Sequence, residues 1–172
     1  MMRRILIAGI GNIFLGDDGF GVEVARRLQE RELPPGAEVV DYGIRGMDLA
    51  YALVDTYDAV IFVDAAQRGE PPGTLSVIEH DPSQERTTQP DAHSMDPLKV
   101  LSLARVLGAR PIPTLVVACE PELMVSDESG ENILVQLSDP VRASIDPAIE
   151  LVLSVAKELS QAQREFVAEL HL

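Results

Sequence analysis

Residues 5–12, with the sequence ILIAGIGN, decide the fold: six apolar or glycine residues run without interruption into a glycine and an asparagine. A continuous apolar run without polar alternation is typical of a strand buried on both faces, as in parallel sheets covered by helices. Phe20, Val24 and Leu28 then recur at helical spacing, with charged residues between them. The start of the chain therefore predicts a strand, a loop and a helix.

The same alternation continues along the chain. Further strands are predicted over 38–42, 59–63, 74–78 and 114–119. Further helices are predicted over 47–54, from Pro97 with Asp96 as its cap and Leu98, Leu101, Ala104 and Leu107 on one face, and from Ser138 onward. Pro147 inside the last pattern predicts a kink or a split. Strands alternating with helices predict a three-layer α/β protein with a mostly parallel sheet.

Composition limits the classes of partner. The chain has 28 acidic and 14 basic residues and a net charge of −14, with no basic cluster, so nucleic acid is not an expected partner. No apolar run is long enough to span a bilayer, so we expect no membrane association. The N-terminal segment MMRRILIAGIGN lacks a small-residue cleavage site, which favours a cytoplasmic protein. Without an internal repeat or linker, residues 1–172 are expected to form one domain, with 157–172 as a poorly anchored helical tail.

Acidic residues follow several of the predicted strands. These are Asp17 and Asp18 after the first strand, Asp41 in the second, Asp64 after the third and Glu120 after the last. Ligands of open α/β sheets bind outside the carboxyl ends of the strands, so these side chains should gather at one rim. Crowded carboxylates repel each other unless a cation binds them. The pattern therefore predicts a divalent metal at this edge.

One histidine belongs to the same prediction. Residues 81–96 show no apolar periodicity, and a stretch of that length in a compact domain is usually functional or disordered. His93, in this stretch, would complete a three-ligand set with Asp18 and Asp64 that leaves coordination positions open, as in reactive metal sites. Of the two remaining histidines, His80 is interpreted as structural, and His171 is interpreted as having no role.

Two other functions share parts of this pattern. A glycine-rich strand exit at 9–12 suggests a nucleotide-binding Rossmann-like module, but Phe14 stands where the third glycine is needed. An acidic pair with Asp64 is also typical of a receiver-like phosphoacceptor domain, but the last strand ends at Cys119 without the required lysine. The sequence offers no candidate nucleophile for covalent catalysis, because no serine lies in a G-x-S-x-G turn and the cysteine is predicted in a buried strand.

Four segments together resemble the nickel-iron hydrogenase maturation proteases. They are GIGN (9–12) with Leu15, Asp17, Asp18 and Gly21; DYGIRG (41–46); VDA (63–65); and AHSM (92–95). Their order and spacing agree with that family over roughly residues 4–156. The resemblance implies a five-stranded, mixed α/β/α sandwich in which 74–78 runs antiparallel.

The resemblance also implies an activity. Members are aspartyl-type, metal-dependent endopeptidases that cut once near the C-terminus of the hydrogenase large-subunit precursor, after nickel insertion. The catalytic and metal-contacting positions fall on Asp18, Asp64 and His93, where Asp18 replaces the longer Glu of some members. The nickel arrives with the precursor, no nucleotide cofactor is implied, and the enzyme is a monomer. Substrate-binding positions fall on Asn12, Asp41, Gly43, Arg45 and Gly46.

Overall fold

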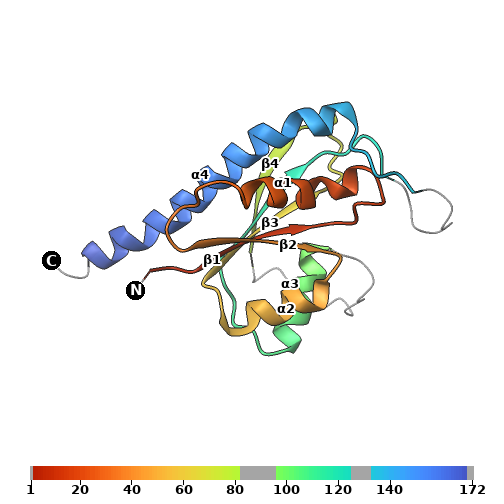
Figure 1. Ribbon diagram of the computed structural model, residues 1–172. Helices are drawn as coiled ribbons and strands as arrows, with labels where there is room; N and C mark the ends of the chain where they lie inside the picture. The colour runs from red at the N-terminus through yellow and green to blue at the C-terminus, as the bar shows by residue number, and fades with distance from the viewer. Residues whose placement is uncertain (1, 82–95, 125–132, 170–172) are drawn as a thin grey trace.

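A five-stranded sheet lies between two layers of helices in the computed structural model, which describes residues 2–81, 96–124 and 133–169 (Figure 1). The strands are β1 (Ile5–Ile10), β2 (Ala37–Gly43), β3 (Ala59–Ala65), β4 (Leu75–His80) and β5 (Thr114–Cys119). Their spatial order is β2-β1-β3-β5-β4. All pairs are parallel except β4 with β5. The predicted fold class and the antiparallel fourth strand are therefore confirmed.

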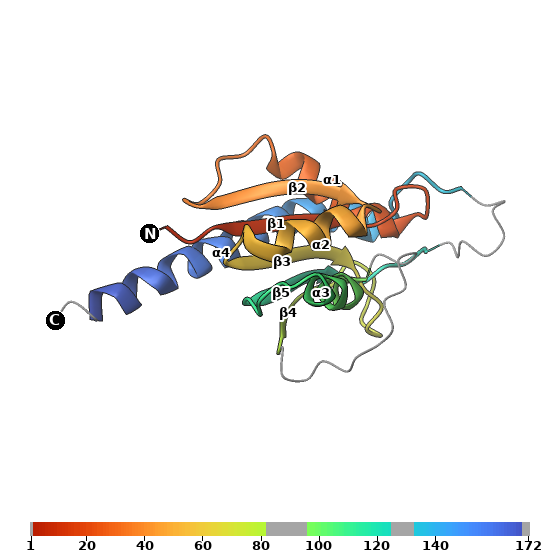
Figure 2. The same cartoon turned by 90° about the horizontal axis from the view of Figure 1, so that it is seen from below.

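Each face of the sheet has its own helical cover. The helices are the short 3₁₀ helix η1 (Asp17–Gly19), α1 (Phe20–Leu28), α2 (Gly46–Asp55), α3 (Pro97–Val106) and α4 (Asp139–Glu169). Helices α1 and α4 lie on one face, and α2 and α3 on the other (Figures 1 and 2). Strands β1 and β3 are buried along their whole length, as the apolar run at 5–10 predicts.

Glycines allow helix α1 to pack closely against the sheet. A Cβ built on Gly21 would lie 2.0 Å from the carbonyl oxygen of Val63 and 2.5 Å from that of Ile10. Gly11 has a φ of 131°, and its Cβ would lie 1.9 Å from the carbonyl oxygen of Asp18. Only glycine permits both the close approach and this backbone conformation. The start of α1, with Asp18 just before it, is thereby held against the carboxyl ends of β1 and β3.

Helix α4 is continuous, so of the two predicted effects of Pro147, a kink or a split, the split does not occur. Pro147 and Ala143, whose carbonyl group loses its helical donor, are both exposed, and water can hydrate that carbonyl. Part of the tail is anchored: Arg3 donates to the carbonyl of Leu159 at 3.3 Å, and Ser160 donates to that of Pro35 at 3.1 Å. The helix extends past the sheet toward the C-terminus (Figure 2).

Helix α3 begins as expected, with Asp96 accepting a hydrogen bond from the Leu98 amide at 2.8 Å. Its expected apolar face is partly wrong, because Leu98 is 52% exposed while Val100 is buried beside Leu101 and Ala104. Among the described residues, no helix combines the length and apolar character needed to cross a bilayer.

Candidate active site

Asp64 is the most strongly perturbed acid of the site. It lies in β3, one residue before the end of the strand, and only 7% of its surface is exposed. Burial raises the pKa of Asp64 well above its usual range, and the negative charges of Asp18 and Asp96 raise it further. A carboxyl group in this setting favours a proton or a cation. Buried acids whose pKa is strongly shifted are common at functional sites.

Asp18 is the second acid of this pair, and η1 places it near Asp64. Its Oδ2 accepts a hydrogen bond of 2.7 Å from the amide of Asn12, in the loop that follows β1. Burial raises the pKa of Asp18 more than this hydrogen bond lowers it. The charge of Asp18 acts on Asp64, so the structure brings together two acids that lie 46 positions apart in the sequence.

The third predicted member, His93, lies outside the described residues. Within residues 2–81, 96–124 and 133–169, no group of three His, Cys, Asp or Glu side chains is placed to hold a metal ion. The two carboxylates alone supply oxygen ligands and an uncompensated negative charge, which fits one side of a divalent cation site.

Asp17 follows the first strand, as the sequence predicts, but its carboxylate is used within the fold. It is fully buried, and its carboxylate accepts hydrogen bonds of 2.7–2.8 Å from the amides of Glu122, Leu123 and Ser138 and from the Ser138 hydroxyl. Burial raises the pKa of Asp17, but the hydrogen bonds outweigh burial and lower it overall. Asp17 therefore joins η1 to the chain after β5 and to the start of α4.

Glu120 is also a structural acid. It is 8% exposed, and its carboxylate accepts hydrogen bonds from the amides of Arg68 at 2.7 Å and Gly69 at 3.3 Å. It thereby closes the loop between β3 and β4. The neighbouring Cys119 is buried as predicted, and burial raises the pKa of its thiol, which keeps the thiol protonated and unreactive.

Four of the five predicted substrate-binding residues line one pocket of about 330 Å³: Asn12, Asp41, Gly43 and Arg45. The loops after β1 and β2 form it, and the Gly11 amide donates to the Gly43 carbonyl at 3.0 Å between them. Gly46, the fifth residue, begins α2 and does not line the pocket. Arg26 of α1 does line it and was missed, because its place in the helical pattern indicates only a charged outer face.

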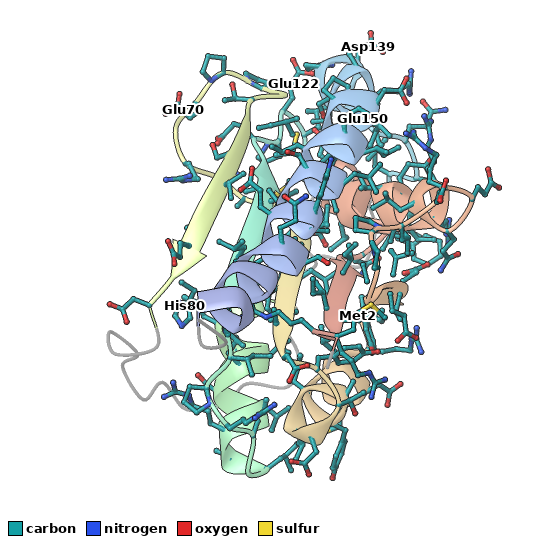
Figure 3. The ribbon with its side chains drawn as sticks, turned by 90° about the vertical axis from the view of Figure 1, so that its left-hand side faces the viewer. Met2, Glu70, His80, Glu122, Asp139 and Glu150 are labelled. Carbon is teal, nitrogen blue, oxygen red and sulfur yellow. The ribbon has the colours of Figure 1, made fainter. Side chains whose placement is uncertain are left out.

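Exposed acids and His80 lie at opposite ends of the sheet. Glu70, Glu122 and Asp139 lie toward one end of the sheet, and Met2 and His80 lie toward the other (Figure 3). His80 ends the antiparallel strand β4 and is paired in register with Thr114, the first residue of β5. It is therefore remote from the carboxyl ends of the parallel strands.

Comparisons with known proteins agree on one family. The family model described as hydrogenase maturation protease matches residues 22–155. The hydrogenase expression/formation protein HoxM of Azotobacter vinelandii is 35% identical over 158 residues, covering 90% of this chain and 73% of the relative. A putative hydrogenase maturation protease of Methanocaldococcus jannaschii is 34% identical over 159 residues, covering 91% and 98%.

A solved structure gives the same result for the fold. The hydrogenase maturating endopeptidase HybD of Escherichia coli superposes with a TM-score of 0.69 at 29% identity, covering 90% of this chain and 93% of that one. The family match covers most of the chain and includes β3, which carries Asp64. The chain belongs to the hydrogenase maturation protease family, and it is an endopeptidase of that family.

Proposed function

We propose that this endopeptidase removes a C-terminal peptide from the precursor of a nickel-iron hydrogenase large subunit after nickel has been inserted. The observation that carries this proposal is the pair Asp18 and Asp64 at the carboxyl end of the sheet, with Asp64 buried and its pKa raised. Such a pair has a charge that only a proton or a cation can offset. The nucleotide-binding and receiver-like alternatives are not retained, because the chain belongs to a protease family.

The precursor's nickel is the recognition element in this proposal. Asp18 and Asp64 contact it through carboxylate oxygens, and His93 supplies a nitrogen ligand. An imidazole and carboxylates are suitable ligands for a borderline divalent ion, and three protein ligands leave positions for groups of the precursor. A precursor without nickel would leave the two carboxylates unscreened and would bind poorly. The metal thus acts as a checkpoint on the timing of cleavage.

The protein's own contribution to the chemistry is proton transfer. Water adds to the carbonyl carbon of the scissile peptide bond, and its proton passes to the Asp64 carboxylate. Asp64 then returns the proton to the leaving amine as the carbon–nitrogen bond breaks. A carboxylate has two oxygens, so one oxygen of Asp64 can contact the nickel while the other exchanges the proton.

The pocket between the loops after β1 and β2 holds the precursor near these acids. Asn12 connects the two regions, because it lines the pocket while its amide binds the Asp18 carboxylate. Asp41, Gly43 and Arg45 line the same pocket, and Gly46 fixes the start of the adjoining helix. In this proposal the enzyme is a cytoplasmic monomer that meets its precursor transiently.

A processing assay tests the proposal. Asp64→Ala and His93→Ala should each abolish shortening of a nickel-loaded precursor, while circular dichroism and thermal melting show a folded protein. Asp139→Ala is the matched control, because its side chain is 97% exposed and pairs with Arg142, three residues along the same helix. Wild-type processing by either of the first two variants would refute the assigned site.

A further inference from the structure

The pocket between the β1 and β2 loops has two arginines in its lining. Acidic residues outnumber basic residues by 28 to 14 in the whole sequence. The charged residues that line the pocket are instead two arginines, Arg26 and Arg45, and one aspartate, Asp41. Arg26 lies 3.3 Å from Asp41 and Arg45 lies 3.6 Å from Asp48, so each guanidinium faces one carboxylate and the pocket offers an anionic group the remaining N–H donors.

Arg26 has N–H groups available for a ligand. Its Nε donates to Oδ2 of Asp41 at 3.3 Å, and its side chain is 53% exposed. Within the described part of the chain, its two terminal nitrogens have no other partner. A guanidinium presents its N–H groups as a planar fork that matches the two oxygens of a carboxylate. Arg26 can therefore bind an incoming carboxylate while it keeps its contact with Asp41.

Arg45 is held in place by its neighbours. One terminal nitrogen donates to the backbone carbonyl of Asp41, and the other lies 3.6 Å from the Asp48 carboxylate. Its guanidinium carbon lies 5.5 Å from the ring centroid of Tyr42. These contacts restrict the side chain before any ligand arrives, which lowers the entropy lost on binding.

Apolar side chains flank the two arginines. Phe14, on the loop after β1, is 50% exposed, and Ile44, on the loop after β2, is 63% exposed. Exposed apolar side chains around a hollow are typical of a binding site. The volume of about 330 Å³ is at the low end of the range for ligand pockets, roughly 300–1,000 Å³. It suits one or two amino-acid side chains.

We propose that this pocket binds a carboxylate group of the peptide substrate, flanked by apolar residues, through the guanidinium groups of Arg26 and Arg45. The inference rests on the proposed function in one respect, since it takes the bound group to belong to the precursor. Two parts of a precursor can present a carboxylate, namely an acidic side chain near the scissile bond and the free C-terminus of the peptide to be removed.

Short fluorescein-labelled peptides test the proposal by fluorescence polarisation. The amidated peptide Ala-Ile-Glu-Ile-Ala should bind about tenfold more tightly than its Gln and Lys counterparts, which is the order expected for one charge-assisted, bidentate contact. The Gln peptide with a free C-terminus tests the other source of the carboxylate. Tighter binding of either acidic peptide supports the proposal and identifies the source.

Three arginine variants locate the contact. Arg26→Gln and Arg45→Gln should each remove most of the preference for a carboxylate. Arg27→Gln is the matched control, since Arg27 lies next to Arg26 on α1 but pairs with Glu23 and Asp146 outside the pocket. The preference should survive in this control and should weaken at high salt.

The proposal is overturned if no acidic peptide binds more tightly than its neutral counterpart, if the Lys peptide binds best, or if Arg27→Gln loses the preference as fully as Arg26→Gln. Processing of a nickel-loaded precursor by the wild-type enzyme separates this result from a failure of the proposed function. Intact processing without carboxylate preference refutes only the pocket assignment. Carboxylate preference without processing of any precursor refutes only the proposed function.

Discussion

Asp17 and Asp64 are both buried acids, yet their surroundings have opposite effects. Asp17 accepts hydrogen bonds from three amides and a hydroxyl, which favour its ionised form. Burial disfavours the ionisation of Asp64, and the charges of Asp18 and Asp96 disfavour it further. The first arrangement stabilises the fold, and the second stores an unfavourable interaction where a cation or proton can relieve it. This contrast distinguishes an acid that holds the fold from the one that we propose acts in cleavage.

Asp17→Asn should lower the free energy of unfolding by about 3 kcal/mol, because a neutral amide replaces a buried carboxylate and turns donors toward other donors. The pKa of Asp17 is lowered from 3.8 in the folded state, so its contribution is present above pH 3.8 and lost as the pH falls through the folded pKa. Urea denaturation at several pH values measures this. Equal stability of variant and wild type at neutral pH would contradict it, and Asp139→Asn serves as the exposed control.

Asp64→Asn should have the opposite effect on stability. The folded pKa of Asp64 lies above 3.8, so the folded state binds the proton more tightly and the wild type loses stability as the pH rises from 3.8 toward the folded pKa. In EDTA at pH 7 the variant should be more stable than the wild type by about 1 kcal/mol, since it removes a charge repelled by its neighbours. A variant less stable than the wild type at pH 7 would count against this account.

At the scale of the elements, the apolar runs were the most informative part of the sequence. Strands β1 and β3 are buried on both faces, and their continuous apolar sequences therefore predict a buried strand directly. Edge elements were less well predicted: β4 was expected at 74–78 and occupies Leu75–His80, with side chains only partly buried. Alternating exposure gives a weaker signal at strand ends than continuous burial does.

Gly21→Ala should destabilise the protein by about 2–3 kcal/mol and reduce processing, because the new methyl group would meet the Val63 and Ile10 carbonyls and push the start of α1 away from the sheet. Gly69→Ala is the control. Nothing lies within 4 Å of its Cβ, so only its positive φ of 78° carries a cost, about 1 kcal/mol. Thermal melting and the processing assay measure both. Equal losses in the two variants would rule out packing as the reason.

Pro147→Ala should raise the free energy of unfolding by about 1–2 kcal/mol. Alanine restores the amide that can donate to the Ala143 carbonyl, and it removes the clash of the proline ring within α4, while greater freedom of the unfolded chain offsets part of the gain. A rise of a few degrees in the melting temperature is expected. A lower melting temperature would show that α4 depends on a bend at this position.

At the scale of the whole molecule, the sequence predicted which segments meet but not how each polar group is used. The carboxyl ends of parallel strands predicted an acidic rim, and Asp18 and Asp64 do lie together there. Asp17 and Glu120 do follow the first and last strands, but the sequence did not reveal their structural role, because their amide partners lie 51 to 121 residues away and leave no local pattern. Arg26 was missed for a similar reason. His93 remains a prediction.

The central claim is that cleavage depends on the nickel carried by the precursor. The most direct measurement compares the purified enzyme acting on nickel-loaded and nickel-free forms of the same precursor, with the shortened product followed by mass spectrometry. The account predicts that only the nickel-loaded form is shortened, and that Asp64→Ala shortens neither. Cleavage of both forms at the same rate by the wild-type enzyme would contradict it.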